Sequence, residues 1–559
     1  MTVPDLPRLA DAAAALTLER SYETLSGDSV RGFNACVELC DRHVGNHRTA
    51  LRWLSADGDE AMLTFEELQR RAARFAALLV AGGAKPGDRV AGLLPRRPEL
   101  LTVLLGAARA GCVYQPLFTA FGPKAIEDRI ALSEPVMIVT DRANRPKIQN
   151  KRSAHILVID EPSGEESFAD ALDGASEDFE PVMMSAAAPF LMMFTSGTTG
   201  SPKGVLVPIH MLRGTWSYLR YAADLRDDDS FWNLADPGWA YGLYYALCGP
   251  LFLGIPTTLV EASFTVERCY DVIRRFKINN LAGAPTAYRA MAASGIPAPS
   301  PLRVISSAGE PLDRETASWL AAHFDCPARD HWGQTELGMV IGDHHGVDHP
   351  DSAGRLGYPM PGWSATVLRA DGTPCDAGEA GILAIDRHSP LFWFGGYHGS
   401  SAQPFVGDHY LTGDTAMRDS DGAFRFVGRN DDVITSSGYR IGPTEVESAL
   451  LEHPLVAEAA VVGKPDAART EVVKGFVTLL PGTEPSDGLA KEISHFVKTR
   501  LAAHAYPREI EFVSALPKTP SGKIQRFMLR NQEIAKADAA RNDGAKAGDV
   551  GRPFQDADP

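Results

Sequence analysis

The sequence lacks the long apolar runs of a membrane protein and the basic charge of a nucleic-acid-binding protein. Its longest apolar stretches, such as 189–194, are far shorter than the ~20 residues that span a bilayer. No basic segment followed by an apolar one marks a signal peptide at the N-terminus. The formal net charge is −16, and a nucleic-acid partner requires a basic face. We therefore expect a cytoplasmic protein with no membrane span and no nucleic-acid partner.

Paired cysteines are also missing. The seven Cys residues are scattered, and Cys36 and Cys40 lie four apart with no second pair at zinc-ligand spacing. This pattern suits a reducing compartment. His344, His345 and His349 lie among Gly and Pro residues, so we interpret them as part of a polar loop rather than as metal ligands.

Helical and strand patterns alternate from about residue 60. Thr64 and Glu67 form a capping-box pattern that predicts a helix start, and Gly82-Gly83 ends the helical spacing. A strand over 90–94, a helix over 98–110 and strands near 113 and over 136–140 follow. This alternation predicts an α/β fold with mixed and parallel sheets covered by helices. Such sheets tend to bind ligands beyond the carboxyl ends of their strands.

A domain boundary is expected in the polar stretch 429–432. Beyond it, strands over 459–462, 472–480 and 510–513 and a helix over 489–502 are predicted to form a small α+β unit. We therefore predict three segments along the chain: an N-terminal domain over 1–430, a mobile C-terminal domain over 431–534 and a disordered tail over 535–559, which is rich in Ala, Asp, Lys and Gly.

A loop rich in glycine and hydroxyl residues follows the predicted strand over 190–194. Its glycines let the backbone turn tightly and approach a ligand closely. Hydroxyls, backbone N–H groups and Lys203 can all donate to phosphate oxygens. A helix over 210–225 follows. The loop consists of Thr195, Ser196, Gly197, Thr198, Thr199, Gly200, Ser201, Pro202, Lys203 and Gly204.

This loop is not a Walker A motif, because Lys203 lies between Pro202 and Gly204 rather than before Ser or Thr. Nor does it match the dinucleotide-binding fingerprint. It closely resembles the signature of the adenylate-forming (AMP-binding) superfamily, which includes acyl-CoA synthetases, peptide-synthetase adenylation domains and luciferases. Further motifs occur in the family's order, so the resemblance covers about residues 30–530.

The resemblance implies an ATP site. Gly309-Glu310-Pro311 resembles the segment that packs on adenine, and 331–336 resembles the motif in which Thr335 bonds phosphate and Glu336 helps to hold Mg²⁺. Mg²⁺ accepts one carboxylate together with substrate phosphates. In the motif 412–414, Asp414 would accept hydrogen bonds from the ribose hydroxyls. The remaining residues that the resemblance places at the nucleotide are Trp332, Gly333, Gln334, Arg429 and Arg440.

The resemblance also implies a CoA site and a mobile catalytic lysine. In the hairpin 436–440, Ser437, Gly438 and Tyr439 would line the pantetheine tunnel, although a simple hairpin turn has the same pattern. Arg129 lies where related enzymes contact the CoA nucleotide, and a surface-helix Arg is an equal alternative. Lys523 would stabilise charge as the carboxylate attacks the α-phosphate of ATP. The C-terminal domain would then rotate about Asp431 for transfer to CoA.

The predicted acyl pocket comes from correspondence with related ligases. Acetyl-CoA synthetases carry Trp at the position of Gly333, so we expect Gly333 to leave that end open, while Tyr241 closes part of it. The hairpin and the segment 506–512 look most like medium-chain acyl-CoA synthetases. We therefore expect a ligase for short- to medium-chain or branched carboxylic acids. The residues assigned to the pocket are Trp239, Ala240, Tyr241, Ala308 and Gly333.

Three other functions are open at this stage. An acetyl- or propionyl-CoA synthetase would share every motif. A carrier-protein-loading adenylation enzyme would share the first half-reaction, but no Ser-centred carrier motif follows residue 530. A non-catalytic nucleotide-binding homologue would have little need for Lys203, Glu336 and Lys523 together.

Overall fold

The computed structural model describes residues 6–150, 153–164, 166–196, 202–299, 301–350, 352, 354–400, 403–429, 432–436, 439–466, 469–501, 505–518 and 524–548. The side chains of Ser196, Thr435, Tyr439, Arg440 and residues 538–548 are not described. The chain forms a large compact unit over 1–366, 384–412 and 420–424, and a small unit over 367–383, 413–419 and 425–559. The predicted domain limits at 430–431 and 534–535 stay predictions.

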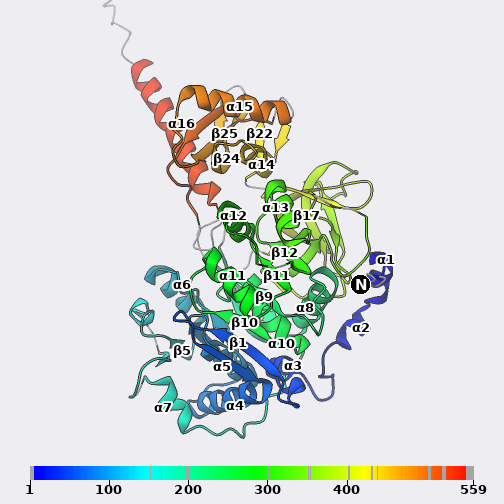
Figure 1. Ribbon diagram of the computed structural model, residues 1–559, viewed down its shortest axis with the longest axis vertical. Helices are drawn as coiled ribbons and strands as arrows, with labels where there is room; N and C mark the ends of the chain where they lie inside the picture. The colour runs from blue at the N-terminus through cyan, green and yellow to red at the C-terminus, as the bar shows by residue number, and fades with distance from the viewer. Residues whose placement is uncertain are drawn as a thin grey trace, which may run out of the picture. The chain divides into compact units, whose positions relative to one another are not determined.

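A seven-stranded sheet in the large unit confirms the predicted alternation of strands and helices (Figure 1). Its strands β7, β4, β3, β5 and β6 run parallel, whereas β8 pairs antiparallel with β7 and β18 antiparallel with β8. The order is β18 (Tyr397–His398), β8 (Pro202–Pro208), β7 (Pro189–Ser196), β4 (Val113–Pro116), β3 (Arg89–Leu93), β5 (Met137–Thr140) and β6 (His155–Val158).

The helix that follows Thr64 begins and ends as the sequence predicts. The Thr64 side chain accepts from the backbone N–H of Glu67, the Glu67 carboxylate accepts from the backbone N–H of Thr64, and Gly82 is the C-cap. This helix is α4 (Phe65–Ala81), which packs against α5 (Pro98–Arg109). Gly106 in α5 allows that approach, because a Cβ there would lie 2.7 Å from Phe75 Cβ.

A second sheet of six strands carries the motifs around residues 309 and 331. The strands β9, β11, β12 and β13 are parallel, and β14 and β15 add antiparallel pairs. The order is β15 (Tyr358–Pro359), β14 (Gly338–Gly342), β13 (Ala328–Gln334), β12 (Val304–Ala308), β11 (Asn280–Gly283) and β9 (Phe231–Asn233). A third sheet has the order β10 (Thr257–Val260), β1 (Thr49–Leu54) and β2 (Glu60–Thr64).

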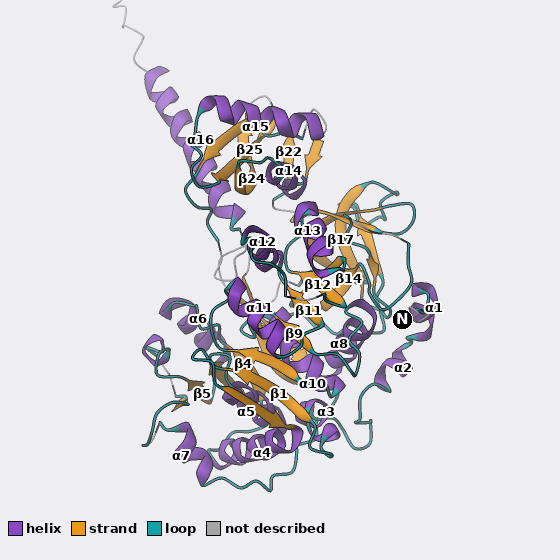
Figure 2. Ribbon diagram, viewed as in Figure 1, coloured by secondary structure: helices purple, strands orange, loops and turns teal. Residues whose placement is uncertain are grey.

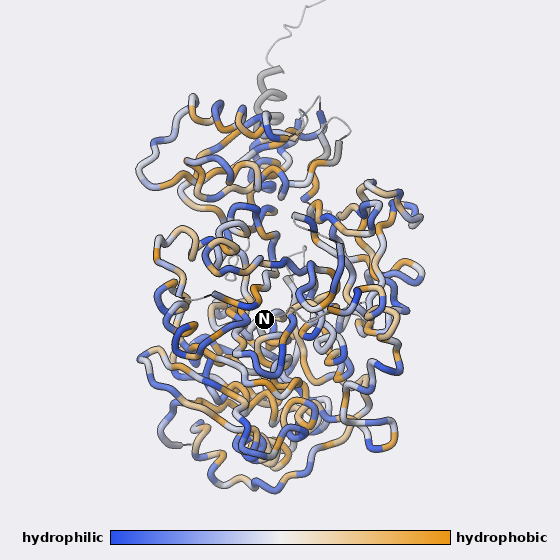
Figure 3. The backbone as a smooth tube through the Cα atoms, turned by 45° about the vertical axis from the view of Figure 1, so that its right-hand side comes forward, coloured by the Kyte–Doolittle hydropathy of each residue, from blue (hydrophilic) through white to orange (hydrophobic). Residues whose placement is uncertain are grey.

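Helices and loops complete the large unit (Figure 2). Figure 3 shows hydrophobic segments gathered mainly on the inside and hydrophilic ones on the outer loops. The further helices are α1 (Leu9–Ala15), α2 (Leu18–Tyr22), α3 (Ala35–Leu39), α6 (Pro123–Ser133), α7 (Phe168–Asp173), α8 (Leu212–Ser217), α9 (Ala240–Gly242), α10 (Gly249–Leu253), α11 (Val266–Arg275), α12 (Pro285–Ala293) and α13 (Arg314–Phe324). Within the described residues, no helix combines the length and apolar character needed to cross a membrane.

The predicted helix over 210–225 is interrupted. It consists of the short 3₁₀ turn η3 (Ile209–Met211), α8 and the π-helical turn η4 (Tyr218–Ala222). A second π-helical turn, η5 (Leu243–Cys248), follows α9. The 3₁₀ turns η1 (Asp41–His43) and η2 (Arg145–Lys147) are the other short helices. π-turns inside helices are rare and occur frequently at functional sites.

The small unit is an α+β fold, as predicted. Its core packs α14 (Pro443–Leu451) and α15 (Asp487–Arg500) on a sheet with the order β23 (Tyr439–Ile441), β22 (Ile434–Ser436), β25 (Thr470–Leu479) and β24 (Val456–Asp466). β26 (Glu509–Phe512) pairs with β25. α16 (Arg526–Gly548) extends into the segment from 535 for which composition predicts a frayed tail; its many Ala residues favour helix.

The last sheet has the order β16 (Ala365–Leu368), β17 (Ala380–Asp386), β20 (His409–Arg418) and β19 (Phe405–Val406), with β21 (Phe424–Arg429) paired to β20. The division into compact units runs within strands β16, β17, β20 and β21. Strand β20 carries Asp414, and β21 ends at Arg429.

Candidate functional site

The glycine-rich loop is the connection of a β-hairpin. Strands β7 and β8 pair antiparallel, and Thr195 lies opposite Lys203. Sequence reasoning predicted the first strand and missed the second. Residues 197–201, which include the predicted phosphate ligands Gly197, Thr198, Thr199 and Gly200, lie outside the described part of the chain, as does the side chain of Ser196.

Lys203 and Glu336 both contact Tyr397, a residue that the sequence analysis did not identify. The Lys203 Nζ lies 4.9 Å from the centroid of the Tyr397 ring. The Tyr397 hydroxyl donates to Glu336 Oε1 over 2.7 Å. Strand pairing explains the approach, because Tyr397 lies opposite Val205 and its neighbour His398 lies opposite Gly204. The structure therefore brings together the predicted phosphate lysine and the predicted magnesium carboxylate.

Two tyrosines hold the segment that leads to Glu336. The Gln334 side-chain amide donates to the backbone oxygen of Thr412 over 2.9 Å and accepts from the Tyr410 hydroxyl over 2.9 Å. The backbone oxygen of Thr335 accepts from the Tyr244 hydroxyl over 3.0 Å. These bonds fix the backbone on both sides of residue 335. Glu336 and Trp332 are buried.

The turn after β12 presents Gly309 and Pro311 to solvent, and Gly309 adopts a positive φ of 105°. The Glu310 carboxylate between them is already hydrogen-bonded: it accepts from Arg289 over 2.6 Å and from Thr286 over 2.5 Å. The next residue along, Leu312, donates its backbone N–H to Asp330 Oδ2 over 3.1 Å. An exposed turn with its carboxylate held by two neighbouring side chains is compatible with the predicted contact with an adenine ring.

Asp330 was missed by sequence reasoning. Its Oδ1 atom is buried and has no hydrogen-bond partner among the described residues. Burial raises the pKa of Asp330 to about 7. A buried carboxylate oxygen without a donor is costly, so a bound ligand that donates a hydrogen bond here would be stabilised.

The region beside Gly333 corrects one expectation. A Cβ at Gly333 would lie 2.2 Å from the backbone oxygen of Gly338 and 2.7 Å from Met339 Cα. Strands β13 and β14 approach each other closely at a bulge between Trp332 and Gly333. The side-chain direction of residue 333 is therefore filled by backbone, and Gly333 does not open the end of the predicted acyl pocket in that direction. Its place in the pocket stays a prediction, as does that of the buried Ala308.

Tyr241 is the partly exposed member of an otherwise buried tyrosine cluster. Its hydroxyl lies 3.0 Å from that of Tyr218, which lies 3.1 Å from His331 Nδ1. His331 Nε2 lies 2.9 Å from the backbone oxygen of Asp343. Burial lowers the pKa of His331 to about 4. The ring of Tyr245 packs against the rings of both Tyr218 and Tyr241.

Trp239 and Arg129 meet at one aromatic ring. The Trp239 ring lies 5.5 Å from that of Phe121 and 5.3 Å from that of Phe118. The Arg129 guanidinium lies 4.2 Å from the centroid of Phe121 and donates to the backbone oxygen of Ala125. Arg129 is buried, and burial lowers its pKa. Two residues predicted to contact acyl and CoA groups thus pack on the same ring, whereas Ala240 begins the short helix α9.

In the small unit, the predicted ribose residues are paired. Arg429 Nη1 lies 3.0 Å from Asp414 Oδ1, and Asp414 is buried. The hairpin expected around residue 438 is present, because β22 and β23 pair with Ser436 opposite Tyr439. The following predicted positions fall outside the described residues or side chains: Asp431, Ser437, Gly438, Tyr439, Arg440 and Lys523.

The predicted polar histidine loop is instead packed into the large unit. His344 is buried and His345 is half-buried, and the two lie within hydrogen-bond distance of the backbone oxygens of Tyr358 and Ile305, respectively. His349 Nε2 accepts from the backbone N–H of His344 over 2.9 Å. Among the described residues, no group of three or more His, Cys, Asp or Glu side chains could hold a metal ion. Sequence reasoning underestimated their burial because His344 and His345 lie between Gly342 and Gly346.

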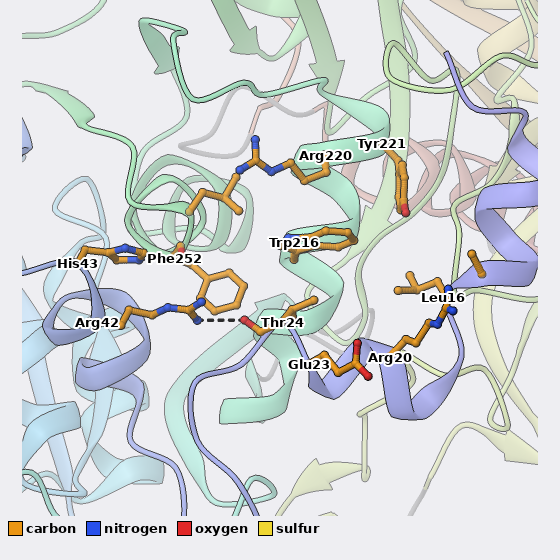
Figure 4. Close-up of a pocket in the computed structure, with 12 residues that line it drawn as sticks. Leu16, Arg20, Glu23, Thr24, Arg42, His43, Trp216, Arg220, Tyr221 and Phe252 are labelled. Carbon is orange, nitrogen blue, oxygen red and sulfur yellow. Dashed lines mark hydrogen bonds between the residues drawn. The ribbon is translucent and has the colours of Figure 1, made fainter. Parts of the chain in front are cut away.

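A cavity of about 500 Å³ lies elsewhere in the large unit. Figure 4 shows Trp216, Arg220 and Tyr221 reaching into it from α8 and η4, opposite residues of α2 and η1. Arg42 is already paired with Glu38 there, and Arg220 with Asp227. None of the predicted site residues lines this cavity.

Comparison with known proteins identifies the family. Residues 40–398 match the model of the AMP-binding enzyme family, and residues 445–523 match that of the AMP-binding enzyme C-terminal domain. The chain is 36% identical over 521 residues to an acetyl-coenzyme A synthetase of Bacillus subtilis, which covers 90% of this chain and 91% of that protein.

Solved structures agree. An acyl-CoA synthetase of Brucella canis is 51% identical with a TM-score of 0.76, covering 95% of this chain and all of that one. A benzoate CoA ligase from Burkholderia xenovorans is 28% identical with a TM-score of 0.79, covering 89% of this chain and all of that one. The chain therefore belongs to the AMP-binding enzyme family and is an AMP-forming acyl-CoA synthetase, which joins a carboxylic acid to CoA with ATP.

Proposed function

We propose that this synthetase activates short- to medium-chain or branched carboxylic acids in the cytoplasm, with Lys203, Glu336 and Asp414 at the nucleotide. The observation that carries the nucleotide assignment is the contact of Lys203 and Glu336 with the same tyrosine, Tyr397. A lysine ammonium can bind the phosphate oxygens of a magnesium triphosphate, and a carboxylate can bind its Mg²⁺ ion.

Magnesium fits Glu336 as a ligand shared with the nucleotide. Mg²⁺ usually keeps several waters and is bound by one or two carboxylates together with substrate phosphates. Glu336 is one buried carboxylate bonded to the tyrosine that Lys203 also contacts, with no second acidic ligand required. When bound, Mg²⁺ would neutralise charge on the leaving pyrophosphate. Tyr397 would hold the carboxylate in one orientation.

Two half-reactions are proposed for the chain's own residues. In the first, a carboxylate oxygen attacks the α-phosphorus of ATP, and the bond to pyrophosphate breaks. Lys523 would stabilise the charge that develops on the α-phosphate oxygens. In the second, the CoA thiolate attacks the acyl carbon, and AMP leaves. Ser437, Gly438, Tyr439 and Arg129 would guide CoA, with Asp431 as the hinge.

The residues assigned to the acyl pocket limit the size of the carboxylic acid. Tyr241 and its neighbours are bulky, and the Gly333 side is closed by the backbone of Gly338. This favours the short end of the proposed range. The Bacillus subtilis relative is named an acetyl-CoA synthetase, so acetate and propanoate belong among the acids to test.

ATP–pyrophosphate exchange across acids of two to eight carbons, followed by detection of the CoA thioester, tests the proposal. We expect exchange and thioester with the same acids. Exchange without thioester would point to loading of a carrier protein instead. Absence of exchange with every acid would contradict the proposed substrate class.

A further inference from the structure

The hydrogen bonds that end at Tyr241 have a fixed direction. A backbone carbonyl only accepts, so the contact between His331 Nε2 and the Asp343 oxygen places the imidazole hydrogen on Nε2. A neutral imidazole carries one hydrogen, and burial keeps His331 neutral by lowering its pKa. Nδ1 of His331 is therefore an acceptor.

The direction propagates through both tyrosines. Since Nδ1 accepts, the Tyr218 hydroxyl donates its only hydrogen to His331 over 3.1 Å. Its oxygen can then only accept from Tyr241, whose hydroxyl lies 3.0 Å away. Tyr218 and His331 are 1% and 2% exposed, whereas Tyr241 is partly exposed and forms the accessible end of the chain.

The accessible end therefore presents an acceptor and no donor. The hydrogen of Tyr241 is committed to Tyr218, and its oxygen keeps a lone pair. Tyr245 packs on both rings and limits their movement. Burial raises the pKa of Tyr241, so its hydroxyl keeps its hydrogen.

We propose that Tyr241, oriented by Tyr218 and His331, selects acids that carry a neutral hydrogen-bond donor, a hydroxyl group, at the end away from the reacting carboxylate. This inference rests on the proposed function, because it takes Tyr241 as a wall of the acyl pocket. An acid with a methyl group there leaves the Tyr241 oxygen unsolvated. An acid with only a hydrogen-bond acceptor at that end would place it against the Tyr241 oxygen, which is also an acceptor.

Matched pairs of acids test this selection. Exchange would be measured with 3-hydroxypropanoate against butanoate and with 4-hydroxybutanoate against pentanoate, which differ by hydroxyl for methyl. We expect kcat/KM to favour the hydroxy acid by about tenfold or more at the length that reaches Tyr241, since sites built for a hydroxyl reject analogues that lack it. Tyr241→Phe should remove most of that preference.

Tyr218→Phe distinguishes a directed chain from simple packing. It frees the hydrogen of Tyr241, so the ratio of kcat/KM for 4-oxopentanoate over 4-methylpentanoate should rise above that of the wild type. Tyr221→Phe is the matched control: it removes a hydroxyl from the same π-helical turn, in the cavity of Figure 4 and outside the chain. It should leave both ratios unchanged.

The inference is overturned if no pair shows a preference for the hydroxy acid or if Tyr241→Phe leaves the ratio unchanged while exchange with butanoate persists. An unchanged oxo-acid ratio in Tyr218→Phe would refute the assigned direction. Loss of exchange with every acid in the wild type would refute the proposed substrate class instead. Circular dichroism and ATP binding verify that each variant is folded.

Discussion

Tyr397, in the two-residue strand β18, donates a hydrogen bond of 2.7 Å to Glu336. Glu336 is buried, so the bond restricts the orientation of its carboxylate. Hydrogen bonds to charged groups contribute about 1.5–3 kcal/mol, enough to affect a metal-bound substrate measurably.

Tyr397→Phe should therefore weaken magnesium-dependent activation. We expect the Mg²⁺ concentration for half-maximal pyrophosphate exchange to rise about tenfold, because the Glu336 carboxylate loses its orienting donor. A magnesium titration at saturating ATP and acid measures the effect, with Tyr221→Phe as the control. An unchanged midpoint would show that Tyr397 only packs against Lys203.

Lys523→Ala should separate the two half-reactions. We expect acyl-AMP formation to be lost, since the charge on the α-phosphate would no longer be stabilised, while thioester formation from supplied acyl-AMP persists. Lys518→Ala is a control in the same region, because Lys518 is paired with Glu458. Equal loss of both half-reactions would contradict the role of Lys523.

Asp330→Asn should change the pH dependence of stability. Burial raises the folded pKa of Asp330 to about 7, so the folded protein keeps a proton that the unfolded chain loses above about pH 4. The protonated Asp330 therefore makes its full contribution to the free energy of unfolding below pH 4. That contribution is lost as the pH rises to 7, by about 4 kcal/mol at most. Without ligand, the variant should gain Tm over the wild type at pH 8, and the gain should shrink toward pH 4. A difference in Tm that does not vary with pH would contradict this account.

Glu447→Ala should destabilise the small unit. The buried Glu447 carboxylate accepts from Arg526 Nε and Nη2 over 2.8 and 2.6 Å and from the backbone N–H of Val461. Removing one partner of a buried pair costs about 3–5 kcal/mol. Chemical denaturation followed by a probe in the small unit measures the loss.

The matched control for Glu447 is Glu452, the C-cap residue of the same helix, α14. Glu452 pairs with Arg500 at 3.0 Å, and both side chains are more than 40% exposed. Glu452→Ala should cost less than about 1 kcal/mol, as exposed pairs do. Similar losses in the two variants would show that burial does not decide the strength of the Glu447 pair.

Local signals in the sequence predicted much of the fold. The capping box at Thr64 is confirmed because it depends on two residues only three positions apart, Thr64 and Glu67. The second strand of the β7–β8 hairpin was missed, because Pro202 and Gly204 interrupt the alternation of apolar and polar residues that marks a strand. The ordered motifs identified the family, whereas their geometry depends on contacts far apart in the chain.

Tyr397 shows where prediction from sequence stops. It lies in a strand of two residues, which is too short for any periodic signal. Its contact with Glu336 joins residues 61 positions apart. The direction of the chain from His331 to Tyr241 was equally invisible, because it follows from a backbone oxygen at Asp343 that no side-chain pattern reveals.

Lys203 pairs with Thr195 in the sheet, so the register of the strands determines the direction of the lysine side chain. Side chains alternate between faces along a strand, so a shift of one residue reverses the face of every residue in it. The connecting loop could change in length without turning Lys203 away from Tyr397. A single inserted residue inside β8 would turn the ammonium to the other face. The position of the Lys203 ammonium thus depends on the register of the sheet.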